Sequence, residues 1–106
     1  MSKRMRKRYL AFRVASEQST SKRDVADAVW NAILKLFGEY GASQTHLALI
    51  EYNQEKRWGI IRCSHRTVEM VRAAVASITE INEKPVTIYV LGVSGTLKAL
   101  KRKVSP

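Results

Sequence analysis

The stretch THLALIEYNQEKRWGIIRC, residues 45–63, contains two apolar segments joined by a short polar link. Residues 45–53 and residues 57–63 each have the length and composition of a β-strand. Because two antiparallel strands need only a few residues to turn, the link at 53–56 favours a hairpin. The sequence therefore predicts a strand–turn–strand unit at the centre of the chain.

Helices flank this unit on both sides. Ser21 is a candidate cap for a helix from about residue 22, and Gly38 and Gly41 are expected to end it. Ser64 is a candidate cap for the second helix. The full set of predicted elements is a strand at 8–16, a helix at 22–37, strands at 45–53 and 57–63, a helix at 65–80, a strand at 86–92 after Pro85, and a short basic helix at 96–104.

The order β-α-β-β-α-β predicts an α+β, ferredoxin-like split βαββαβ two-layer sandwich. Its antiparallel sheet has the order 4-1-3-2, both helices cover one face, and a short C-terminal basic helix follows. At 106 residues, we expect one domain. It divides into a basic N-terminal arm at 1–8, a ferredoxin-like core at 9–92 and a basic tail at 93–106.

Composition narrows the class of protein. The hydrophobic content of 45% is typical of a globular domain. Cys63 is the single cysteine, which excludes an internal disulfide and a cysteine-based zinc site and favours a cytoplasmic location. No apolar run reaches the ~20 residues needed to span a membrane, so we expect no membrane partner.

The net charge of +10 is concentrated at the two ends of the chain. Residues 1–8 and 98–106 contain no acid, whereas basic and acidic residues nearly balance between them. Such runs are typical of contact with a polyanion. The basic residues predicted to bind RNA phosphates at the ends are Lys3, Arg4, Arg6, Lys7, Arg8, Lys98, Lys101, Arg102 and Lys103.

The predicted topology places these ends together. In a 4-1-3-2 sheet, the start of strand one lies beside the ends of strands three and four, where the second helix also begins. Arg62, Ser64 and Arg66 are therefore predicted to join the basic runs. Backbone N–H groups at the start of a helix favour anions, so we expect a phosphate-binding pole.

The sheet has apolar residues on both faces, so its second face needs a cover. The tail helix is one candidate, and a protein partner or self-association is another. Trp58, Ile60 and Val90 are the residues predicted to face a partner. Strand three carries Trp58 as its single aromatic residue, which leaves the stacking surface of an RNA recognition motif incomplete. We therefore expect contacts to phosphates, ribose and RNA shape.

Two catalytic alternatives exist. His46 and His65 are expected at the same pole, where a small stand-alone ribonuclease could use them as acid and base. An acylphosphatase-like site would need Arg62 and Asn53, but no glycine-rich phosphate loop precedes the first helix. The carboxylates are scattered, so we predict no metal site.

Three stretches resemble archaeal ribonuclease P protein component 2. They are RYLAF at 8–12, GIIRCS at 59–64 followed by VEMVRAAVASIT at 68–79, and VLGVSGTLK at 90–98. The resemblance covers about residues 6–103, and the basic N-terminal extension and the C-terminus are the parts that vary most in the family. That family is homologous to a small subunit of the eukaryotic ribonuclease P and MRP enzymes.

The resemblance implies an RNA-binding, non-catalytic subunit of the enzyme that removes the 5′ leader from precursor tRNA. Catalysis would belong to ribonuclease P RNA, which uses Mg²⁺, and the protein itself would bind no cofactor. The implied partners are this RNA, ribonuclease P protein component 3 and other protein subunits, with precursor tRNA contacted indirectly. A general RNA-binding protein of another ribonucleoprotein, such as the ribosome, is the alternative.

Overall fold

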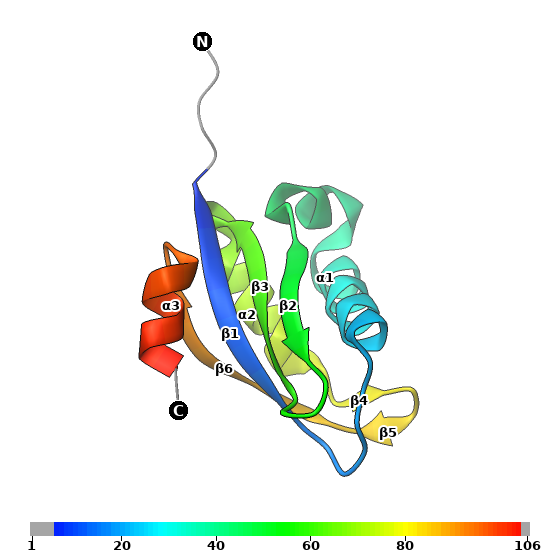
Figure 1. Ribbon diagram of the computed structural model, residues 1–106. Helices are drawn as coiled ribbons and strands as arrows, with labels where there is room; N and C mark the ends of the chain where they lie inside the picture. Colours follow the sequence, from blue (N-terminus) through cyan, green and yellow to red (C-terminus); the bar gives the residue numbers. More distant parts are fainter. Residues whose placement is uncertain (1–5, 105–106) are drawn as a thin grey trace.

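The computed structural model describes residues 6–104 (Figure 1). Four strands form an antiparallel sheet in the order β2-β3-β1-β6, which confirms the predicted 4-1-3-2 order and the ferredoxin-like fold. The elements are β1 (Lys7–Ala15), α1 (Lys22–Thr45), β2 (Ala48–Asn53), β3 (Trp58–Ser64), a 3₁₀ turn (His65–Thr67), α2 (Val68–Ser77), β4 (Glu80–Ile81), β5 (Lys84–Pro85), β6 (Thr87–Ser94) and α3 (Leu97–Val104).

Helix α1 begins where the sequence predicts and ends later. The Ser21 side chain accepts a hydrogen bond from the Asp24 backbone N–H at 3.1 Å. Gly38, with φ of 74°, ends the first regular helical segment, as predicted, and a second helical segment follows directly after this kink. The helix continues through Gly41 to Thr45, and His46 closes it in the left-handed conformation that ends many helices.

Two further boundaries differ from the prediction. The Ser64 side chain does not cap a helix; a 3₁₀ turn follows it, and α2 is shorter than the predicted 65–80. Pro85 belongs to a small hairpin of β4 with β5, and the fourth sheet strand starts at Thr87. Gly92 lies inside that strand, which continues to Ser94.

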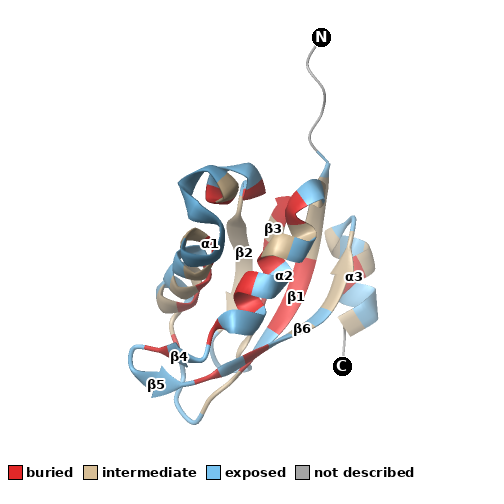
Figure 2. Ribbon diagram, turned by 180° about the vertical axis from the view of Figure 1, so that it is seen from behind, coloured by how far each residue is buried: buried red, intermediate tan, exposed pale blue. Residues whose placement is uncertain are grey.

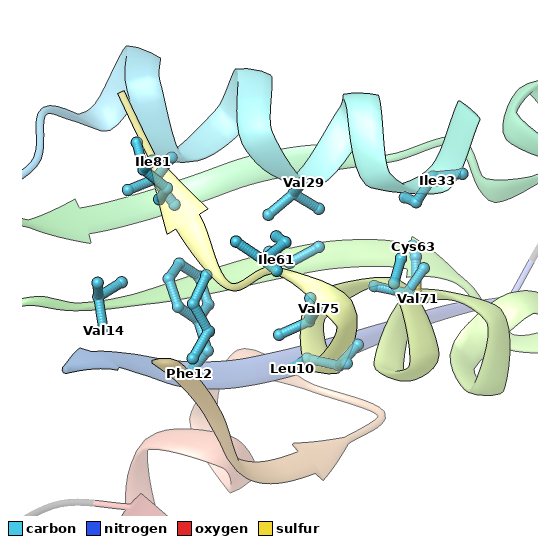
Figure 3. Packing of buried hydrophobic residues seen from close by; sticks show 14 of the residues in the cluster. Leu10, Phe12, Val14, Val29, Ile33, Ile61, Cys63, Val71, Val75 and Ile81 are labelled. Carbon is cyan, nitrogen blue, oxygen red and sulfur yellow. The ribbon is translucent and has the colours of Figure 1, made fainter. Parts of the chain in front are cut away.

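The main core fills the space between the sheet and helices α1 and α2. Buried residues line the sides of these elements that face one another (Figure 2). Figure 3 shows Val29 of α1 and Val75 of α2 close to Ile61 and Leu10 of the sheet. Phe12 of β1 stacks on Tyr52 of β2, with 6.2 Å between ring centroids. Helices α1 and α2 thus cover this face of the sheet.

Helix α3 packs on the other face of the sheet, beside β1 and β6 (Figure 1). Leu100 is buried there with Ala11 and Ile60, and Leu97 and Val104 extend the contact. The tail helix thus adds a partial third layer. Among residues 6–104, no helix is long and apolar enough to cross a membrane.

Candidate nucleic-acid interface

One end of the sheet brings three basic segments together. Lys7 pairs with Ser64, and Tyr9 pairs with Ser94, so the start of β1 lies between the ends of β3 and β6. The backbone N–H of His65 donates to the carbonyl of Arg6 at 2.9 Å. We call this region the basic pole; its described cations are Arg6, Lys7, Arg8, Arg62, Arg66 and Lys98.

The charge of the basic pole is not neutralised by acids. The ion pairs found within residues 6–104 join Arg72 to Glu69 and Lys101 to Glu51, and neither involves a pole residue. The guanidinium of Arg8 lies close to Gly95, two residues before α3. Over the same residue range, the buried Nε of Arg62 has no hydrogen-bond partner. The described cations of the pole are therefore not paired with acids.

Helix α2 points its N-terminal end at this pole. Within the described chain, neither Ser64 nor Thr67 caps the 3₁₀ turn or the helix with a side-chain hydrogen bond. The first backbone N–H groups of a helix have no partner inside the helix, and the dipole makes this end positive. Phosphate oxygens are suitable acceptors for such groups.

Ser64 itself does not present its hydroxyl for RNA binding, which corrects its predicted role. Its side chain is 5% exposed. The Oγ donates to the carbonyl of Gln44 at 2.9 Å and lies 2.7 Å from the hydroxyl of Thr67. Ser64 thus joins the end of β3 to the end of α1.

Of the C-terminal basic residues, Lys98 lies at the pole, but Lys101 and Arg102 lie farther along α3, contrary to the prediction. Helix α3 starts beside Arg8 and runs back along the sheet for about 12 Å. Lys101 pairs with Glu51 of β2 at 3.1 Å, and Lys103 donates to the carbonyl of Val93. Arg102 is exposed on this helix. The predicted contacts of Lys3 and Arg4 lie outside the described residues.

The predicted partner-facing surface is wrong for two of its three residues. Ile60 is fully buried beneath Leu100. Val90 packs against the main core, on the helix side of the sheet. Trp58 is on the open face and remains partly exposed beside the second cluster.

Exposed apolar side chains occur instead on α1. Sequence spacing places Leu36 and Phe37 on the buried stripe of that helix, but they are 48% and 37% exposed. They lie next to the kink at Gly38, with Trp30 before it and Tyr40 after it. The apolar side chains that flank the kink are therefore exposed, although Ala42 beyond it is buried in the core, and no pattern of apolar spacing indicates this.

The open sheet face also holds Tyr89, an aromatic residue outside the predicted set of site residues. Tyr89 of β6 pairs with Arg13 of β1, which pairs with Trp58 of β3. The three side chains therefore share one face. The alternation in VTIYVLG places Tyr89 opposite Val90, and this signal was sufficient to find it.

The residues named for the two catalytic alternatives lie in a turn, at the end of a helix and in two strands. His46 closes α1, and His65 lies in the 3₁₀ turn. Asn53 pairs with Trp58, four residues along β3 from Arg62, so Asn53 and Arg62 are about 13 Å apart along the strand. The Asn53 side chain accepts the backbone N–H of Lys56 in the hairpin. Within residues 6–104, no three metal-binding side chains gather.

Cys63 lies under the pole but faces the core. Its side chain is fully buried. Burial raises the pKa of the Cys63 thiol, while a hydrogen bond with Thr67 and the charge of Lys7 partly oppose this shift. The thiol is therefore neutral and shielded at physiological pH.

Comparisons with known proteins cover nearly the whole chain. The model of the Rpp14/Pop5 family matches residues 8–105. Ribonuclease P protein component 2 of Pyrococcus furiosus is 42% identical over 100 residues, which is 94% of this chain and 83% of that protein. The protein of the same name from Methanosarcina mazei is 40% identical over 102 residues, or 96% of this chain and 86% of that protein.

A solved structure shares the fold. A chain in the cryo-EM structure of yeast ribonuclease MRP aligns with a TM-score of 0.72 over 91% of this chain and 79% of that chain. The sequence identity is 12%, so this likeness concerns the fold alone. On the match to the family model and on the identity to the archaeal proteins, the chain belongs to the Rpp14/Pop5 family.

Proposed function

We propose that this chain is an RNA-binding, non-catalytic subunit of ribonuclease P. It assists ribonuclease P RNA in removing the 5′ leader from precursor tRNA. The observation that carries the proposal is the strand register that joins the starts of β1, α2 and α3 into the basic pole. Membership of a family that includes ribonuclease P proteins supports the identity of the complex.

The basic pole would bind ribose-phosphate chains. Cations without acidic neighbours release counterions from RNA, and the N-terminal end of α2 supplies backbone donors. The Mg²⁺ ions of the reaction would be held by the RNA. The protein would stabilise the folded RNA that performs the chemistry.

A protein partner fits the exposed apolar surface of α1. The exposed apolar side chains of α1, including Trp30, Leu36 and Tyr40, supply surface that ribonuclease P protein component 3 or another subunit would cover. Charged residues at the pole would then remain available to RNA. One chain would thus contact RNA and protein through separate surfaces.

Reconstitution tests the proposal. Ribonuclease P RNA is combined with the partner subunits, with or without this chain, and leader cleavage of precursor tRNA is followed as Mg²⁺ is lowered. We expect the chain to raise cleavage at low Mg²⁺ and the Arg6→Ala/Lys7→Ala/Arg8→Ala variant to do so less. Equal cleavage with and without the chain would contradict the proposed function.

A further inference from the structure

Three side chains form a continuous row across the open face of the sheet. Arg13 of β1 pairs in register with Trp58 of β3 on one side and with Tyr89 of β6 on the other. Directly paired residues project from the same face of a sheet, with their Cβ atoms about 5 Å apart. The guanidinium carbon of Arg13 lies 5.7 Å from the centroid of the Tyr89 ring. The row alternates aromatic ring, planar cation and aromatic ring.

Helix α3 leaves Arg13 and Tyr89 of this row exposed, while Trp58 packs partly against the cluster under the helix. Its apolar side chains cover Ala11 and Gly92, which lie two to three residues closer to the basic pole on β1 and β6. Tyr89 is 49% exposed, and its neighbour Leu91 is 47% exposed. Flat apolar surface thus remains in contact with solvent immediately beyond the end of the helix.

A hollow of about 460 Å³ adjoins the row, within the range of about 300–1,000 Å³ found for ligand pockets. Glu51 is the one acidic residue that lines it, and this carboxylate is paired with Lys101 at 3.1 Å. The hollow therefore has an excess of positive charge. Its other lining residues are apolar, Trp58, Leu91 and Val104, or cationic, Arg13, Lys56 and Lys101.

We propose that the row of Trp58, Arg13 and Tyr89 binds unpaired nucleotides of RNA by stacking. The faces of aromatic rings and of guanidinium groups stack on bases, and nearby cations contact the flanking phosphates. The positive charge favours RNA over an apolar protein segment as the occupant. The proposal rests on the proposed function and adds a second contact: phosphates bind at the basic pole, and exposed bases stack on the opposite half of the sheet.

Tryptophan fluorescence can observe this site directly. The chain has two tryptophans, so the Trp30→Phe variant leaves Trp58 as the single reporter. The variant is titrated with a single-stranded oligoadenylate and with an abasic ribose-phosphate oligomer of the same length. We expect the oligoadenylate to quench Trp58 emission and the abasic oligomer to leave it unchanged.

Substitutions then separate stacking from charge. Tyr89→Leu and Trp58→Leu keep an apolar side chain but remove the ring. Each should weaken oligoadenylate binding by about five- to hundredfold, as measured for base–aromatic stacks, without changing the salt dependence. Tyr40→Leu is the matched control, because Tyr40 is 80% exposed on α1, away from the sheet face. Unchanged thermal unfolding of each variant verifies the fold.

The failures of the two proposals differ. Stacking would be overturned if the chain bound the oligoadenylate and the abasic oligomer equally well and Tyr89→Leu did not change this binding. If that binding still depended on salt, the proposed function would stand. Normal RNA binding by both row variants, combined with lost assembly with the protein subunits, would assign the row to a protein partner and also overturn stacking. If the wild-type chain binds neither oligomer nor ribonuclease P RNA, both proposals fall.

Discussion

Leu100 packs on Ile60 across the sheet face opposite to α1 and α2, and both side chains are completely buried. The contact joins the last helix to the central hairpin strand. Together with Ala11, these residues form a small second core under α3. The tail helix is therefore an integral layer of the domain and a determinant of which part of the sheet face remains open.

Shortening Leu100 tests this role. Leu100→Ala should lower the free energy of unfolding by about 2–5 kcal/mol, because it leaves a cavity between α3 and the sheet. Urea unfolding followed by circular dichroism measures the change. Leu91→Ala serves as the control, since Leu91 is 47% exposed and its truncation should cost much less. Equal losses for the two variants would show that α3 is not docked as described.

Gly59 is required by close packing. A Cβ at this position would lie 2.7 Å from the backbone oxygen of Glu51 and 2.8 Å from the Phe12 ring. Gly59→Ala should therefore destabilise the domain by about 1–3 kcal/mol, as overpacking of a core does. Thermal unfolding gives the measurement.

The control for this variant is Gly95→Ala. Its Cβ would meet only the end of the flexible Arg8 side chain, at 3.2 Å. A small change at Gly95 and a large one at Gly59 is the expected pair of results. The prediction fails if Gly59→Ala unfolds at the wild-type temperature.

The sheet order could be predicted from the sequence because each strand has a clear apolar pattern and the β-α-β-β-α-β order leaves few topologies. The burial of Ile60 could not, because an apolar sheet face accepts a tail helix or a partner equally well. The continuation of the helix beyond Gly38 could not be predicted either, because a glycine can end a helix or bend it. The same is true of the positions of Lys101 and Arg102. They depend on the direction in which α3 turns back, and the packing of Leu100 sets that direction.

Alkaline pH should weaken the fold through Cys63. Burial raises the pKa of this thiol from the ordinary value of 9.0, so the folded protein retains a proton that the unfolded chain releases. The neutral thiol thus stabilises the fold fully below pH 9.0, and this contribution is lost as pH rises from there toward the raised pKa. Between pH 8 and pH 10, the free energy of unfolding should therefore decrease more for the wild type than for Cys63→Val.

The same burial predicts slow thiol chemistry. In the folded protein at neutral pH, Cys63 should react with an aromatic disulfide reagent only as fast as the domain opens, and urea should make the reaction immediate. A fast reaction without denaturant would contradict the burial of this side chain.

The salt dependence of RNA binding tests the basic pole itself. Each lost phosphate contact should reduce the slope of log affinity against log salt by about 0.7 for a single strand. Arg6→Ala/Lys7→Ala/Arg8→Ala should therefore flatten the slope by up to about two units. The matched control removes three exposed cations from α1, through Lys22→Ala/Arg23→Ala/Lys35→Ala. The control lowers the net charge equally but leaves the pole intact, so its slope should remain close to that of the wild type. Equal flattening by both variants would indicate that RNA responds to total charge and not to the pole, because only a localised contact distinguishes the two sets of cations.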